Sequence, residues 1–176
     1  MRPIKRVVMI GPESTGKTEM AEYLASCFND LWMPEFAREY VEKLQRPYNY
    51  NDVEIIARKQ VELETEFARK AKHCLFIDTD LIITKVWFDI VFKLCPSWVV
   101  ESIQKMPRDL YLLFKPDIPW VYDGVRENSE NREKLFEIYQ QELNIFGFPY
   151  KVIEGKGQAR FLMGKGHVDS CFYSHI

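Results

Sequence analysis

Residues 11–18, with the sequence GPESTGKT, match the phosphate-binding pattern GxxxxGK[ST] at every fixed position. They follow a short apolar run, residues 7–10, and precede a segment whose apolar side chains recur at helical spacing. This order of strand, loop and helix predicts a nucleoside triphosphate site, because loop N–H groups and the helix N-terminus surround the phosphates. We expect Lys17 on the β- and γ-phosphates and Thr18 on magnesium. The residues predicted to bind the triphosphate are Gly11, Glu13, Ser14, Thr15, Gly16, Lys17 and Thr18.

Length and charge limit what can surround this loop. The chain has 176 residues, 47% of them hydrophobic, which is enough for one well-buried domain. Its formal net charge is −2, so nothing in the charge favours nucleic acid or an acidic membrane as a partner. The richest apolar segment, residues 81–94, contains three charges, so we expect no membrane-spanning segment. A small-molecule partner fits better, and the oligomeric state, including a homo-oligomer, stays open.

The cysteines indicate the compartment. All four are widely separated and form no CxxC pair. This pattern is typical of reduced thiols, and it predicts a cytoplasmic protein.

Predicted strands and helices alternate along the chain, which is the pattern of a parallel sheet covered on both faces. We therefore expect a three-layer α/β phosphate-loop fold with about five strands. Asn51 or Asp52 is expected to cap a long helix that ends near Lys72, and Gly147 to end the last clear helix. The predicted strands are residues 6–10, 31–35, 74–77, 110–114 and 150–153. The other predicted helices are residues 36–44, 81–94 and 98–106.

Asp78 stands at the predicted carboxyl end of a strand, after four apolar residues. Parallel strands end at the same edge as the phosphate loop, so Asp78 and Asp80 are expected near the γ-phosphate. Asp78 is predicted to help hold magnesium. The alternative is that Asp78 or Asp80 caps the following helix, which is an ordinary use of aspartate after a strand.

Glu35 follows another short predicted strand at the same edge of the sheet. A carboxylate there could accept the proton of a hydroxyl that attacks the γ-phosphate. The alternative is that Glu35, Arg38 and Glu39 form the charged first turn of a helix. The residues alone leave both interpretations open.

Residues 120–132 form a polar arm before the last clear helix. Small kinases often use arginines of a mobile lid to stabilise the charge that develops during phosphoryl transfer, and Arg126 and Arg132 are the candidates here. Gly124 would act as a hinge, and Asp123 could orient an arginine or cap the turn. The alternative is a solvated loop with incidental charges.

These motifs together resemble the ribosylnicotinamide kinase domain of NadR-type proteins, over about residues 5–153. The matching strings are PEFARE at 34–39, IARKQ at 56–60, FIDTD at 76–80 and WVYDGVR at 120–126, besides the phosphate loop. The resemblance implies a nucleoside-kinase-like fold and transfer of the ATP γ-phosphate to the 5′-hydroxyl of nicotinamide riboside, with ATP and Mg²⁺ as cofactors. The implied catalytic residues are Lys17, Glu35, Asp78 and Arg126, with Arg132 also on ATP. The candidate substrate contacts are Glu35, Arg38, Tyr40, Asp80 and Trp87.

The chain also departs from the NadR pattern. NadR proteins carry an adenylyltransferase domain before the kinase, which has no place here, so we expect kinase activity alone. Pro34 stands where the family tends to have an aromatic residue before the glutamate. The candidate aromatic replacements are Trp32, Phe36, Tyr40, Tyr50 and Trp87. Residues 1–154 are expected to form the kinase domain, and residues 155–176 a glycine-containing tail that is short, flexible or altered.

Two other functions stay open. A kinase for another nucleoside or a vitamin alcohol would use the same phosphate-binding residues, because the fold does not choose the acceptor. A regulatory phosphate-loop ATPase is the more distant alternative, since such proteins need an arginine finger and a second helical domain.

Overall fold

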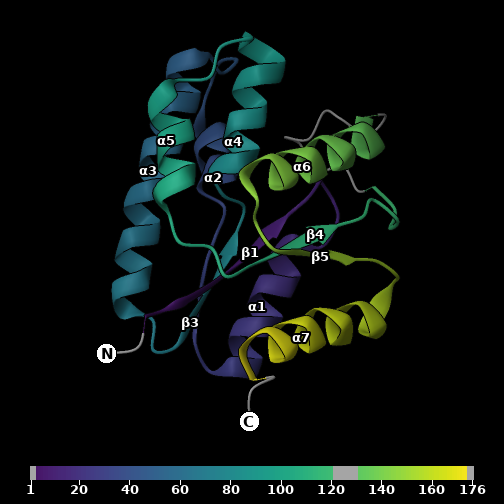
Figure 1. Ribbon diagram of the computed structural model, residues 1–176. Helices are drawn as coiled ribbons and strands as arrows, with labels where there is room; N and C mark the ends of the chain where they lie inside the picture. The colour runs from purple at the N-terminus through teal and green to yellow at the C-terminus, as the bar shows by residue number, and fades with distance from the viewer. Residues whose placement is uncertain (1–2, 121–130, 174–176) are drawn as a thin grey trace.

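Five parallel strands form the centre of the molecule (Figure 1). The computed structural model describes residues 3–120 and 131–173. The strands are β1 (Lys5–Ile10), β2 (Leu31–Met33), β3 (Cys74–Asp78), β4 (Leu110–Phe114) and β5 (Tyr150–Ile153). Their order in the sheet is β2-β3-β1-β4-β5, and every neighbouring pair is parallel. The predicted parallel α/β fold is confirmed.

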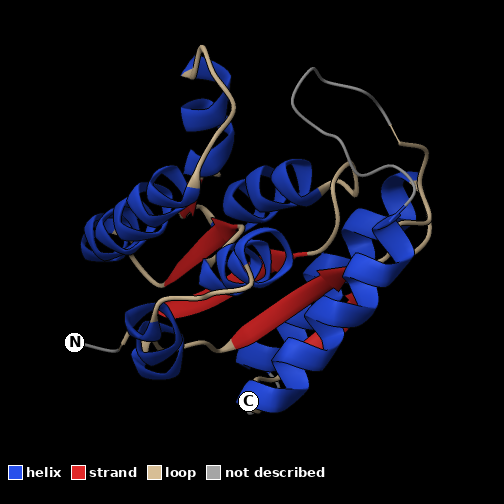
Figure 2. Cartoon of the chain, turned by 90° about the horizontal axis from the view of Figure 1, so that it is seen from above, coloured by secondary structure: helices blue, strands red, loops and turns tan. Residues whose placement is uncertain are grey.

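Helices cover both faces of the sheet (Figure 2). Successive side chains of a strand point to opposite faces, and in β1 this alternation sends Val7 and Met9 to one core and Val8 and Ile10 to the other. Strand residues buried on both sides explain the continuous apolar runs in the sequence. One face carries α1 (Lys17–Phe28) and α7 (Gly157–Tyr173). The other carries α3 (Tyr50–Lys70), α4 (Leu81–Trp87), α5 (Ser97–Lys105) and α6 (Arg132–Phe146).

The start of one predicted helix and the continuity of another differ from the prediction. The N-cap of α3 is Asn49, whose side chain accepts from the Asp52 backbone N–H at 3.1 Å while the Asp52 carboxylate accepts from the Asn49 N–H at 2.8 Å. This capping box uses Asp52 as the third helical residue, so neither Asn51 nor Asp52 is the cap itself. The predicted helix 81–94 is α4 followed by the π-helix η1 (Phe88–Phe92), which ends at Lys93 in the left-handed conformation.

The C-terminal segment forms a helix, so the expectation of a short or flexible tail is wrong. Its glycines lower the helix propensity, but Gly164 has a packing role against α1. A Cβ atom at Gly164 would lie 2.5 Å from Sδ of Met20, so a side chain at this position would have to displace the end of the Met20 side chain. Val168 of α7 is fully buried in the same core. Within residues 3–120 and 131–173, no helix is both long and apolar enough to cross a membrane.

Candidate active site

The phosphate loop connects β1 to α1, and its backbone conformation requires glycine. Gly11 and Gly16 have φ values of 153° and 84°. A Cβ atom at Gly11 would lie 2.8 Å from the carbonyl oxygen of Phe114, so β4 also excludes any side chain there. The Thr15 hydroxyl donates to the carbonyl oxygen of Pro12 at 2.8 Å and closes the turn. Because α1 begins at Lys17, its N-terminal N–H groups follow the loop directly.

Lys17, Thr18 and Asp78 meet at this loop. The Lys17 ammonium donates to the carbonyl oxygens of Gly11 and Pro12, at 3.0 and 2.8 Å. The Thr18 hydroxyl donates to Asp78 Oδ2 at 2.6 Å. Burial raises the pKa of the Asp78 carboxyl above its ordinary value, while the Lys17 charge and the Thr18 hydrogen bond act in the opposite direction. A hydroxyl and a carboxylate are the oxygen donors that Mg²⁺ prefers, so this pair fits the predicted metal site.

A cavity of about 1000 Å³ extends from the loop to α2 (Phe36–Lys43) and α4. Gly11, Glu13 and Lys17 line its loop end, and Glu35 and Arg38 line it further on. The structure thus brings the predicted phosphate site and the predicted base to one space. This volume is within the range of pockets that hold small organic ligands.

Glu35 is the N-cap residue of α2, so its carboxylate stands where β2 has ended and the helix begins. Tyr139 of α6 lines the same cavity and is 6% exposed. Burial raises the pKa of the Tyr139 phenol, and the nearby carboxylates of Glu35 and Glu13 raise it further. Sequence reasoning did not single out Tyr139, although its place in a helix with an apolar inner face was a signal.

Among the candidate aromatic residues, Trp87 lines the cavity. Tyr48 lines it too and packs edge-on against Trp87, with ring centroids 4.8 Å apart. Tyr48 was missed because it lies in the loop between α2 and α3, where no periodicity marks an inward side chain. Tyr40 is not among the lining residues, because its hydroxyl donates to Asp52 Oδ1 at 3.0 Å. Tyr50 packs on the rings of η1.

The other candidates do not reach the cavity. Trp32 packs against the core beneath α1 and α7, and Phe36 contacts the Tyr40 ring. Asp80 is 1% exposed and accepts from the Ile82 N–H at 3.0 Å, which makes it the N-cap of α4. The prediction that Asp80 contacts substrate is therefore replaced by the capping alternative.

The predicted arm lies mostly outside the described residues, which exclude Arg126, Asp123 and Gly124. Arg132 is described, is buried, and donates to the carbonyl oxygens of Ser14 and Ile118, both at 3.1 Å. In the structure Arg132 thus links the backbone of the phosphate loop, at Ser14, to the segment that follows β4, at Ile118.

Arg160 of α7 makes an equivalent contact with the loop that sequence reasoning missed. Its guanidinium donates to the carbonyl oxygens of Thr15 and Lys115, both at 3.0 Å, and pairs with Asp117 at 2.7 Å. No local pattern in the sequence links positions 15 and 160, so only the fold reveals this support.

Comparison with known proteins identifies the family of this chain. A family model described as an AAA domain matches residues 6–160. The chain belongs to this family. The protein named trifunctional NAD biosynthesis/regulator protein NadR, from Escherichia coli K12, is 27% identical over 166 residues, which are 90% of this chain and 40% of that protein. The chain spans about a third to two fifths of the length of the curated relatives it matches.

Solved structures show the same fold. A NadR protein in complex with NR superposes on this chain with a TM-score of 0.83 at 23% identity. The match covers 96% of this chain and 49% of the NadR chain. Deoxyadenosine kinase from M. mycoides gives a TM-score of 0.69 at 10% identity, over 94% and 99% of the two chains. These comparisons confirm both the resemblance to NadR and the nucleoside-kinase-like fold.

Proposed function

We propose that this protein is an ATP-dependent kinase that phosphorylates the 5′-hydroxyl of nicotinamide riboside, giving nicotinamide mononucleotide for NAD biosynthesis or salvage. One observation carries the proposal: Lys17 and Glu35 line the same cavity, and the Thr18–Asp78 pair lies beside Lys17. A phosphate-binding lysine and a carboxylate facing one space are what transfer to a hydroxyl requires.

Each residue has a defined role in this proposal. The loop and Lys17 hold the triphosphate, and Thr18 and Asp78 would hold Mg²⁺, which when bound neutralises charge on the phosphates. Glu35 accepts the proton of the acceptor hydroxyl while the oxygen of that hydroxyl forms a bond to the γ-phosphorus. The bond between that phosphorus and the bridging oxygen of ADP breaks, and ADP leaves. Arg126 is proposed, from the sequence, to stabilise the transferring phosphoryl group.

The acceptor is proposed from two supports. The matching NadR structure was determined in complex with NR. The cavity also carries the paired rings of Tyr48 and Trp87, which offer aromatic surface to a planar base. A second candidate is another nucleoside, because deoxyadenosine kinase shares the fold over nearly the whole chain.

A coupled ADP-release assay over nicotinamide riboside, other nucleosides and vitamin alcohols tests the proposal. We expect ADP release that depends on both Mg²⁺ and an acceptor, fastest with nicotinamide riboside. Lys17→Ala should abolish it while its circular dichroism spectrum stays that of the wild type. ADP release that ignores every acceptor would instead indicate an ATPase and contradict the proposal.

A further inference from the structure

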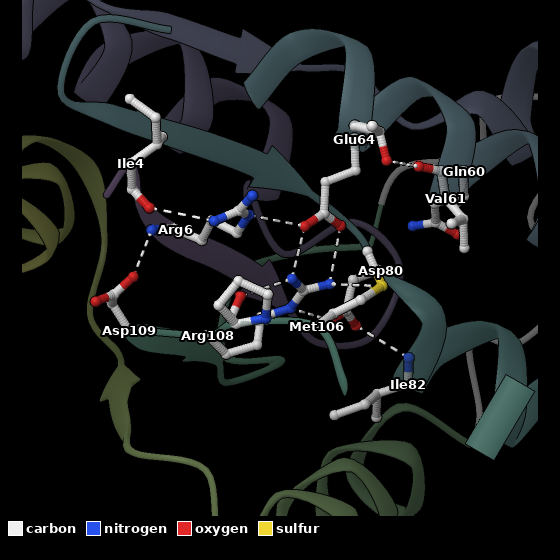
Figure 3. A network of polar contacts seen from close by, with 12 residues as sticks. Ile4, Arg6, Gln60, Val61, Glu64, Asp80, Ile82, Met106, Arg108 and Asp109 are labelled. Carbon is white, nitrogen blue, oxygen red and sulfur yellow. Dashed lines mark hydrogen bonds and ion pairs between the residues drawn. The ribbon is translucent and has the colours of Figure 1, made fainter. Parts of the chain in front are cut away.

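A buried charged network lies on the side of the sheet covered by α3 and α4 (Figure 3). At its centre is Arg108, just before β4, whose side chain is 2% exposed. Its two terminal nitrogens donate to the two oxygens of Glu64 at 2.7 and 2.9 Å. Its Nε donates to Asp80 Oδ2 at 3.1 Å. One guanidinium thus joins the middle of α3 to the start of α4.

The carboxylate of Asp80 is held on both oxygens. Oδ2 accepts from the Tyr111 hydroxyl at 2.6 Å as well as from Arg108, and Oδ1 accepts from the Ile82 N–H. Tyr111 belongs to β4 and is fully buried. The position of Asp80 is therefore set by β4 and α3, not by solvent or by a ligand in the cavity.

Only Thr79 separates Asp80 from Asp78, and its backbone is also fixed. Thr79 has φ of 70°, an unfavourable conformation for a β-branched residue. Its N–H donates to the Met9 carbonyl oxygen at 3.1 Å, and its carbonyl oxygen accepts from Gln60 Nε2 at 2.6 Å. Because residues 78–80 form one short connection, holding Asp80 and Thr79 also sets the direction of the Asp78 side chain toward Thr18.

The charges of the network balance. Arg6 and Arg108 carry two positive charges, and Glu64 and Asp80 carry two negative ones. Arg6 lies on the far side of Glu64 at 3.2 Å, and the contacts of its side chain are with Glu64 and Ile4 rather than with Asp80. Arg6 and Arg108 thus share one partner, but only Arg108 reaches the connection that carries Asp78. Comparing variants of Arg108 and Arg6 therefore distinguishes a role in positioning Asp78 from a role in stabilising the fold alone.

We propose that Arg108 and Tyr111 are positioning residues which, through Asp80, hold Asp78 in the direction needed to bind Mg²⁺ beside the phosphate loop. This inference rests on the proposed function of the Thr18–Asp78 pair. Groups that orient a metal ligand typically change metal affinity or activity about 10–100-fold when removed. Residues 78–80 also lead into α4, whose Ile83 and Trp87 line the cavity. The network therefore also fixes the side of the cavity where the acceptor is proposed to bind.

The test compares two matched substitutions, Arg108→Lys and Arg6→Lys, together with Tyr111→Phe. The two lysine variants keep the positive charge but lose the guanidinium group. Tyr111→Phe keeps the aromatic ring but loses the hydroxyl. ATP affinity is measured by calorimetry across a Mg²⁺ titration, and the melting temperature is measured for the same samples. Binding of Mg-ATP is the readout, so the result does not depend on which acceptor is used.

We expect Arg108→Lys and Tyr111→Phe to raise the Mg²⁺ concentration for half-maximal ATP affinity about tenfold. Arg6→Lys should lower the melting temperature without moving that concentration. If all three variants lose stability and keep the wild-type Mg²⁺ dependence, the network is only structural and the inference is overturned. Wild-type protein that binds ATP equally well without Mg²⁺ would contradict the proposed metal site itself, and the positioning role with it.

Discussion

The Thr18 hydroxyl and the Asp78 carboxylate lie 2.6 Å apart although 60 positions separate them in the chain. This pair joins the start of α1 to the end of β3 and defines the candidate metal site. Asp78→Asn keeps the size of the side chain and an acceptor for Thr18 but removes the charge. The gain in ATP affinity that Mg²⁺ produces should then be at least about tenfold smaller than in the wild type. Removing a metal ligand should weaken Mg²⁺ binding at least as much as removing a group that only orients that ligand.

Asp109→Asn is the matched control for Asp78→Asn. Asp109 pairs with Lys5 and accepts from the Arg6 N–H, at the opposite end of β1 from the phosphate loop. Its replacement should leave the Mg²⁺ effect on calorimetric ATP affinity intact. An unchanged Mg²⁺ effect in Asp78→Asn would remove Asp78 from the metal site.

Glu35→Gln should lower turnover about 10²–10⁴-fold, because glutamine cannot accept the hydroxyl proton. ATP affinity should stay within about twofold, since general bases act on the transferring step rather than on the bound donor. Steady-state kinetics and calorimetry on the same protein check both statements. Glu39→Gln, on the exposed side of α2, is the control. Parallel losses of turnover and ATP affinity would show that Glu35 is not the base.

Asp52 makes stability depend on acid pH. Hydrogen bonds from Arg46, helped by those from the Asn49 N–H and the Tyr40 hydroxyl, hold the pKa of its carboxyl well below the ordinary value of 3.8. Above 3.8 the carboxylate is charged and these bonds stabilise the fold, and the stabilisation is lost as pH falls through and below that value. Asp52→Asn should therefore be less stable than the wild type at about pH 7, and the difference should shrink at about pH 3.

Urea denaturation at the two pH values measures the effect of Asp52→Asn. A stability difference that is the same at both values would mean that the charge of Asp52 contributes nothing.

Two glycines of α7 should respond in opposite ways to alanine. Gly166 has nothing within 4 Å of an added Cβ, so Gly166→Ala should stabilise the protein by about 0.5–1 kcal/mol through helix propensity. Gly164→Ala should be less stable than Gly166→Ala by about 1–3 kcal/mol, because the new methyl displaces buried Met20. Urea unfolding compares them. Equal stabilisation by both would show that α7 does not pack closely on α1.

Short-range patterns predicted most of the fold. The phosphate loop is specified by neighbouring residues, and strands buried on both faces leave continuous apolar runs such as residues 74–77 and 110–114. The same reasoning placed Asp78 and Glu35 at one edge, because parallel strands end together. The structure then brings Glu35 and Lys17 to one cavity.

Long-range partners could not be predicted from the sequence. Arg108 meets Glu64 across 44 positions, and Arg160 meets Thr15 across 145. These are single side-chain matches with no periodic signal, and both ends must be placed before either is recognisable. The helix α7 was missed because its glycines argue against a helix locally, whereas its contact with Met20 favours glycine at position 164.

The most direct test of the central claim is to identify the product. Phosphorus NMR of the wild-type protein with Mg-ATP and nicotinamide riboside follows ADP, free phosphate and phosphate ester in one sample. We predict ADP and nicotinamide mononucleotide in equal amounts, with no accumulation of free phosphate. ADP accompanied by free phosphate alone, with nicotinamide riboside unchanged, would contradict the account.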